Sequence, residues 1–295
     1  MKKVYLIKRI FCGAIFFALF TAVSFAEVSP YEPSVVKAFA DSLYEEGFLS
    51  QAEGEYKRFL FSFDNKDDVQ PVDSPELQST LLSLCNIYKV QQNKTGINWL
   101  NDSFYAYALP EVKEKISLLR ADHIFKERNA SAFSDFKTGI ANDISLFSPD
   151  FSSLIQASDF LLNKDFDSLK FNMPLFAAQS VNFEKLNELC SSYKTKSPGL
   201  ALFFSMVLPG SGKWYTGSFP AFVSSFVTVG SFIAGMVVTG IQTEWKSWQP
   251  YVFGTCGLVV YITQLYGSYK SAQRYNDALF RVLCEETENI YGKIY

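Results

Sequence analysis

Two long apolar runs near the C-terminal end dominate the hydrophobic pattern of this chain. Residues 219–241 and 250–269 contain no charged side chain. A helix needs about 20 consecutive apolar residues to cross the hydrocarbon core of a bilayer, and each run is long enough. The pattern therefore predicts two transmembrane helices and argues against a freely soluble chain.

A shorter apolar segment, 199–208, precedes these runs and ends at Pro209-Gly210-Ser211-Gly212. A helix of this length reaches only about 15 Å, half of the hydrocarbon thickness. We expect it to be re-entrant or to lie at the interface, and a third crossing is the alternative. Aromatic residues typical of a membrane interface flank the apolar segments: Trp214, Tyr215, Trp245, Trp248 and Tyr251.

The region before the apolar runs has the spacing of amphipathic helices. Apolar residues recur at three and four from Val36 to Tyr44, and again from Ala52 to Phe63, with Gly47 in the break. Gly47, Ala52 and Tyr56 resemble the second half of a tetratricopeptide repeat, in which small residues let two helices approach closely. Further helices are predicted at 75–92, 94–107, 110–127, 131–147, 151–163 and 175–192. Strand signals are nearly absent, so the predicted fold class is all-α, with stacked helix pairs.

The first 26 residues have the features of a secretory signal peptide. Four basic residues precede an apolar stretch from Ile10, and Ser24 and Ala26 occupy the small-residue positions of a cleavage site. The alternative is an uncleaved N-terminal anchor. Export is therefore predicted for the region that follows.

Charge is divided unevenly between the two parts of the chain. Residues 27–198 hold 17 basic and 25 acidic residues, whereas residues 199–295 hold six and five. An acidic domain lacks the positive surface that nucleic acid requires, so nucleic-acid binding is not expected. The five cysteines are widely spaced, which is not typical of a disulfide scaffold.

These observations predict four segments. Residues 1–26 form the signal peptide, 27–196 the helical-repeat domain, 197–270 the membrane module and 271–295 a C-terminal amphipathic helix. Residues 194–198 are a short polar link, which would hold the helical domain close to the bilayer.

Two motifs flank the apolar runs and carry a resemblance. The first is Pro209-Gly210-x-Gly212-x-x-Tyr215-x-Gly217, preceded by Ser197, Ala201 and Ser205, and the second is Tyr266-Gly267-x-Tyr269-x-Ser271-Ala272-x-x-Tyr275-Asn276. This combination resembles the C-terminal membrane module of bacterial envelope proteins that often carry tetratricopeptide-like helices in front. The resemblance implies a bacterial, membrane-attached helical-repeat protein, and it implies no catalytic residue. Cleavage of the signal peptide would place the helical domain in the periplasm, with the two crossings in the inner membrane.

Several patterns that suggest chemistry do not hold up in detail. Gly210-Ser211-Gly212-Lys213 lacks the first glycine and the Ser or Thr of a phosphate-binding loop. His123 is the only histidine, and no cysteine lies near enough in sequence to complete a usual zinc site. The segment 64–68 lacks the glycine and terminal glutamate of a calcium loop. No cofactor, metal or catalytic site is predicted.

The sequence favours a non-enzymatic scaffold that binds an unidentified envelope protein and the lipid bilayer. A transport or channel component is one alternative, although both apolar runs lack the ionisable residues that transport sites usually carry. An enzyme of unrecognised type is the other. Glycines in the apolar runs would also allow the membrane helices to form a homo-oligomer.

Overall fold

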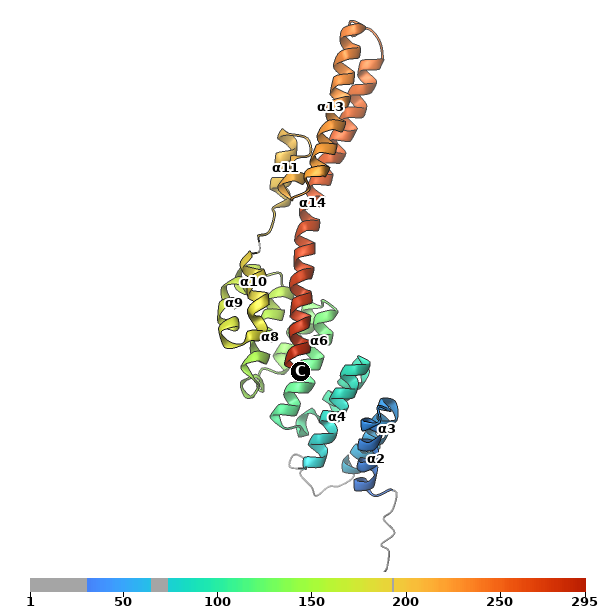
Figure 1. Cartoon of the computed structure of the whole chain (residues 1–295), viewed down its shortest axis with the longest axis vertical. Helices are drawn as coiled ribbons and strands as arrows, with labels where there is room; N and C mark the ends of the chain where they lie inside the picture. The colour runs from blue at the N-terminus through green and yellow to red at the C-terminus, as the bar shows by residue number, and fades with distance from the viewer. Residues whose placement is uncertain (1–30, 65–73, 193) are drawn as a thin grey trace, which may run out of the picture. The chain divides into compact units, whose positions relative to one another are not determined.

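Every secondary-structure element in the described part of the chain is a helix (Figure 1). The computed structural model describes residues 31–64, 74–192 and 194–295. The all-α prediction is confirmed for these residues. The predicted signal peptide, 1–26, and most of the segment 64–68 lie outside them.

The chain divides into two compact units, and the first extends to Lys113. It begins with α2 (Pro33–Glu45) and α3 (Leu49–Asp64), which pack against each other. Gly47 makes the turn between them with a φ of +82°, a backbone conformation that favours glycine. Ala52 and Tyr56 are fully buried, and the Tyr56 hydroxyl donates to Asp41 at 2.8 Å.

A second helix pair follows in the same unit. It consists of α4 (Pro75–Gln91) and α5 (Lys94–Phe104), with a short 3-10 helix, η2 (Tyr105–Tyr107), after them. Ser74 caps α4 by accepting from Leu77 N at 3.3 Å, and Asn93 caps α5 in the same way. A Cβ on Gly96 would lie 2.5 Å from the Tyr88 ring, so a small residue is required where these helices cross.

The second unit starts at Glu114, within α6 (Pro110–Lys126). It continues through α7 (Ala130–Gly139), η3 (Ile144–Leu146), α8 (Pro149–Leu162), α9 (Phe166–Gln179), η4 (Val181–Phe183) and α10 (Glu184–Ser192). Their buried side chains form one core. The predicted helix 175–192 is wrong, because α9 ends at Gln179 and α10 begins only at Glu184. The predicted helix 131–147 is also too long, since α7 ends at Gly139.

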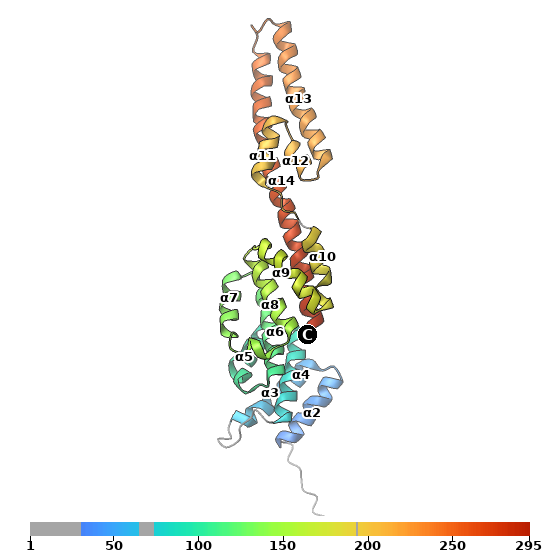
Figure 2. The same cartoon turned by 90° about the vertical axis from the view of Figure 1, so that its left-hand side faces the viewer.

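The rest of the second unit is an apolar module. Two short helices, α11 (Pro198–Val207) and α12 (Ser211–Tyr215), precede α13 (Phe219–Gln242) and α14 (Gln249–Ile294). α13 packs antiparallel to the first part of α14, and α11 and α12 lie beside this hairpin at the end away from its turn (Figure 2). We call the turn at 243–248 the tip of the hairpin. The opposite end, formed by residues 196–217 and by residues 264–276 of α14, is called the foot.

α14 is a single helix of 46 residues, about 69 Å long. It joins two segments that the sequence suggested as separate, 250–269 and 271–295. Its C-terminal part enters the helical core, where Leu283, Cys284 and Ile290 are buried. The Tyr291 hydroxyl is 2.9 Å from Ser158 Oγ on α8. One helix therefore belongs both to the apolar hairpin and to the core of the helical domain.

Candidate functional site

The foot of the hairpin brings together residues of the two sequence motifs. Gly212 N donates to Ser205 Oγ at 2.8 Å, and Ser205 Oγ donates to Ser268 Oγ at 2.7 Å. Both serines are fully buried. A Cβ on Gly212 would lie 2.0 Å from the backbone oxygen of Ala201, closer than any side chain can come. This glycine is required because α11 and α12 touch at their backbones.

The other glycines of the first motif form turns. Gly210, after Pro209, has a φ of +84° and connects α11 to α12, and Gly217 has a φ of +89° and connects α12 to α13. A Cβ on Gly210 would also lie 2.5 Å from Ser225 Cβ. The glycine spacing that suggests a phosphate-binding loop thus serves two tight turns and one close helix contact.

Lys213 lies between the first motif and α14. Its Nζ donates to Ser225 Oγ at 2.8 Å and to Gln264 Oε1, and its side chain passes Gly267. Burial lowers the pKa of Lys213, because loss of water disfavours the ammonium form. Both acceptors are neutral, so no carboxylate compensates the ammonium form of Lys213 at the foot.

Residues of the second motif bind the first motif along one stretch of α14. Ser271 Oγ is 2.7 Å from Thr216 Oγ1, and Ala272 is fully buried. Asn276 bonds both backbone groups of Lys196, at 2.9 and 2.8 Å. The link between the helical domain and α11 is therefore fixed to α14.

Aromatic rings lie beside two lysines of the foot. Lys196 Nζ lies 4.7 Å from the centre of the Tyr215 ring and 5.9 Å from that of Tyr275, and the Tyr215 hydroxyl accepts from Ser197 N at 3.3 Å. Lys270 Nζ lies 5.8 Å from the ring centre of Tyr266, which is exposed. Such contacts hold a lysine without neutralising its charge.

Above the foot, glycines let α13 and α14 pack closely. A Cβ on Gly235 would meet the Phe253 ring at 2.9 Å, and one on Gly257 would meet Phe232 Cβ at 3.1 Å. The outer surface of this hairpin consists largely of exposed apolar side chains. They include Phe226, Val227, Ile233, Val238, Ile241, Val252, Leu258, Val259 and Ile262.

The two predicted membrane spans differ in the structure. Of the described helices, only α13 is long and apolar enough to cross a membrane, with a mean hydropathy of 2.0. Only 11% of its most apolar stretch is buried, so the other described residues leave most of this apolar surface uncovered. The other predicted span, 250–269, is the first part of α14, where Gln264 and several tyrosines reduce the hydropathy. A crossing by α14 stays a prediction.

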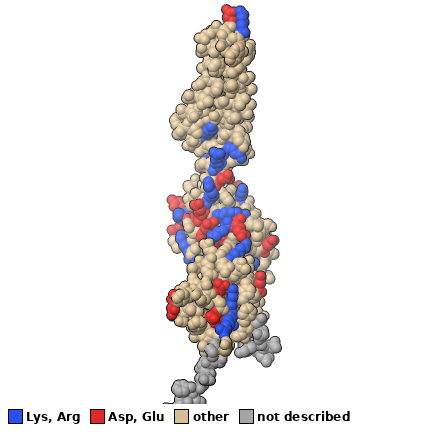
Figure 3. All heavy atoms as spheres, turned by 90° about the vertical axis from the view of Figure 1, so that its right-hand side faces the viewer, with Lys and Arg blue, Asp and Glu red and all other residues tan. Residues whose placement is uncertain are grey.

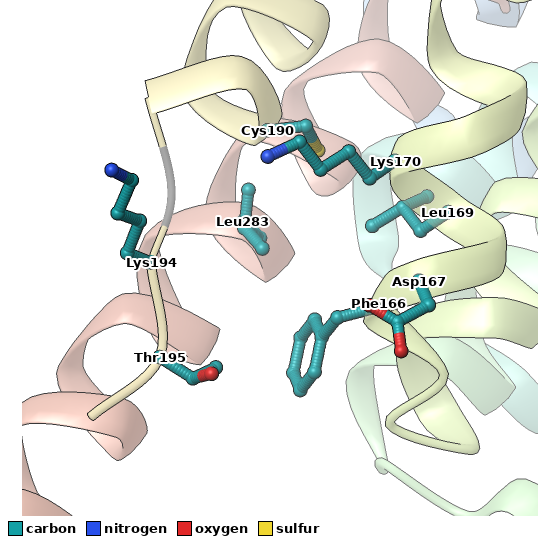
Figure 4. A pocket seen from close by; sticks show the side chains of 8 residues that line it. All are labelled: Phe166, Asp167, Leu169, Lys170, Cys190, Lys194, Thr195 and Leu283. Atoms are coloured by element: carbon teal, nitrogen blue, oxygen red, sulfur yellow. The ribbon is translucent and has the colours of Figure 1, made fainter. Parts of the chain in front are cut away.

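A separate cavity of about 340 Å³ lies between α9, α10 and α14 (Figure 4). Phe166 and Lys170 line it from α9, Cys190 from α10 and Leu283 from α14. Burial raises the pKa of the Cys190 thiol to about 11, so this cysteine is not an activated nucleophile. No group of three or more His, Cys, Asp or Glu side chains that could hold a metal ion occurs in the described residues.

His123, the only histidine of the sequence, directly follows Asp122. Both lie on α6, and Asp122 forms an ion pair with Lys126 at 2.6 Å, one turn further along the same helix. The foot of the hairpin, where hydrogen bonds join the two sequence motifs, is the best-defined candidate site.

Sequence reasoning found the motif glycines and Ser205 but missed three partners. In the sequence, Lys213 follows the glycines that suggest a phosphate-binding loop, and Ser225 and Gln264 lie within the two apolar runs. A polar residue inside each run was the available signal, because a buried polar side chain needs a partner.

The sequence matches no known protein-family model, and no curated protein or solved structure is significantly similar to it.

Proposed function

We propose that this protein is a membrane-anchored helical scaffold of the bacterial cell envelope. The observation that carries the proposal is the exposed apolar surface of α13, which the described residues leave largely uncovered and which a lipid bilayer would cover. In this proposal α13 and the first part of α14 cross the inner membrane as a hairpin, and the helical domain lies in the periplasm.

The packing of α14 supports its role as the second crossing. It lies antiparallel to α13, and residues 250–269 carry no charge. If α13 crossed alone, the exposed apolar side chains in the first part of α14 would have to remain in water. The charged pair Glu244 and Lys246 lies at the tip, where it would reach the opposite interface. Trp245 and Trp248 beside it fit an aromatic belt.

The foot supports an interfacial position for α11. This helix has ten residues, about half of what a crossing requires. Its backbone contact with α12 turns the chain back before α13 begins. Two crossings then place the helical domain and the C-terminus on the same side of the membrane.

A scaffold role is supported by the way the anchor and the domain share α14. Because Tyr291 and its neighbours are part of the core formed with α6 to α10, these helices and the hairpin share one continuous helix. Antiparallel helix pairs, of which α2 and α3 are the first described, are the units from which tetratricopeptide-like arrays are built. Such arrays commonly bind other proteins, and we propose an envelope protein as the partner.

Two experiments test this proposal. Alkaline carbonate extraction should leave the protein in the membrane fraction, and release into the supernatant would contradict the anchor. Cross-linking in intact cells followed by mass spectrometry should recover a stable envelope partner that is linked to residues in the range 31–192. Repeated failure with several cross-linking chemistries would contradict the scaffold role but not the anchor.

A reporter fused after Tyr295, active only on one side of the membrane, tests orientation. Activity in the periplasm is expected. Activity in the cytoplasm would show that the proposed orientation is wrong, but it would not contradict the membrane hairpin.

A further inference from the structure

The foot of the hairpin is unusually rich in positive charge. From residue 189 to 243 the sequence contains three lysines and no acidic residue, and from 245 to 276 it contains Lys246, Lys270 and Arg274 and again no acidic residue. Lys246 is at the tip with Glu244. The remaining cations, Lys194, Lys196, Lys213, Lys270 and Arg274, belong to the foot or the link that leads to it.

The cations of the foot lack the partners that lysines and arginines have elsewhere. Within the helical units, Lys57, Arg128 and Lys185 each pair with a glutamate. By contrast, none of Lys196, Lys213, Lys270 and Arg274 forms an ion pair with any carboxylate that the structure describes. Lys196 and Lys270 lie over aromatic rings, and Lys213 donates to neutral hydrogen-bond acceptors.

These cations share one short stretch of the module. Lys213 contacts Gln264, Lys270 and Arg274 are one turn apart on α14, and Lys196 is held by Asn276. From Gln264 to Asn276 the helix rises about 18 Å. Figure 3 shows the result on one face, where blue atoms gather at the lower end of the tan, uncharged surface of the hairpin.

We infer that the foot binds the phosphate group of an anionic phospholipid. This inference rests on the proposed membrane anchor, which places the foot at the level of the lipid head groups. The cations of the foot adjoin the exposed apolar surface of α13 and α14. A phospholipid likewise carries its anionic phosphate next to its acyl chains, so one lipid molecule could contact both surfaces. Each basic residue near an anionic membrane surface strengthens binding about fivefold.

A cavity suited to an acyl chain adjoins the same surface. It measures about 330 Å³ between α13 and α14 and is lined by apolar residues that include Phe232, Met236 and Leu258. Pro209, at the start of the turn into α12, also lines this cavity. A lipid with its phosphate at the foot could place an acyl chain in this cavity.

The test uses the full chain purified in a mild detergent, with the retained phospholipids identified by mass spectrometry. Wild-type protein should retain phosphatidylglycerol in preference to phosphatidylethanolamine. The triple variant Lys196→Gln, Lys270→Gln, Arg274→Gln should retain at least about tenfold less of the anionic lipid. Lys246→Gln removes a cation of the same module at the tip and should retain it like the wild type.

Three results would overturn the inference. The first is equal retention of both lipids by the wild type. The second is a loss of anionic lipid in Lys246→Gln as large as that in the triple variant. The third is tight binding of inorganic phosphate by the lipid-free wild-type protein, with loss of this binding in the triple variant. The last result would assign the foot to a free anion. If the triple variant does not fold, Arg274→Gln alone, which changes an exposed side chain, should lower retention about fivefold, and unchanged retention would also overturn it.

Failure of the anchor is distinguishable from failure of this inference. Carbonate extraction of the triple variant should still leave it in the membrane, because the apolar hairpin is unchanged. A wild-type chain that dissolves without detergent would contradict the anchor itself, whatever lipid it retains.

Discussion

Asn276 holds the backbone of Lys196 with both ends of its side-chain amide. Its Nδ2 donates to Lys196 O at 2.8 Å, and Lys196 N donates to its Oδ1 at 2.9 Å. These residues are 80 positions apart. The link between the helical domain and the apolar module is thereby fixed to α14, which both parts share.

Replacing this amide should loosen the link. Asn276→Ala removes two hydrogen bonds, each worth about 1 kcal/mol, and should speed amide hydrogen exchange at 194–198 about fivefold or more. Gln273→Ala, on the same helix and without such a bond, is the matched control. Unchanged exchange in Asn276→Ala would show that the link is held by other contacts.

A methyl group at Gly212 should disrupt the foot. Gly212→Ala would place Cβ 2.0 Å from Ala201 O, which is backbone and cannot rotate away. We expect a loss of about 3 kcal/mol or more, measured by thermal unfolding in detergent. Gly230→Ala on α13, where nothing lies within 4 Å, should be neutral or slightly stabilising. Equal unfolding temperatures for the two variants would contradict the close contact of α11 and α12.

The buried serine pair at the foot should contribute measurably to stability. Ser205→Ala leaves Gly212 N–H without an acceptor and Ser268 without its donor, which should cost about 1–3 kcal/mol. Ser231→Ala is the control, because the Ser231 hydroxyl bonds only Val227 O in its own helix and is exposed. A loss no larger than in the control would mean that water replaces the hydroxyl.

Unfolding should become easier as the pH rises from about 9 to 11. Burial raises the pKa of the Cys190 and Cys284 thiols from 9.0 to about 11. Their folded-state pKa exceeds the unfolded value, so this stability is fully present below pH 9 and is lost as the pH approaches 11. Burial also raises the pKa of the Tyr291 hydroxyl.

The double variant Cys190→Ala, Cys284→Ala tests the origin of this pH dependence. Its stability, measured by urea unfolding, should fall less steeply between pH 9 and 11 than that of the wild type. An identical slope would assign the effect to other groups.

The sequence predicts the helices well where apolar residues repeat regularly and capping residues mark the ends. Ser74-Pro75 and Asn93 are such signals, and α4 and α5 begin there. α9 was missed because Pro174 lies inside it, whereas proline normally marks a helix boundary. The continuity of α14 was missed because its apolar part and its amphipathic part have different patterns, although nothing between them stops a helix.

The candidate site was predictable only in part. The spacing of Gly210, Gly212 and Gly217 marks turns and close contacts, but it does not say which helix they contact. Lys213 has its partners 12 and 51 positions away, at Ser225 and Gln264. Side-chain pairs of this kind depend on the tertiary fold, and no local pattern reveals them.

Reactivity of Cys256 tests most directly whether both helices of the hairpin lie in a bilayer. The Cys256 side chain is exposed on α14, in the part whose crossing the hydropathy leaves open. In sealed membrane vesicles from expressing cells, a charged maleimide should leave Cys256 unmodified, as identified by peptide mass spectrometry. Lys246→Cys at the tip should react from one side of the membrane only. Rapid modification of Cys256 in intact vesicles would show that α14 is in water and would contradict the membrane hairpin.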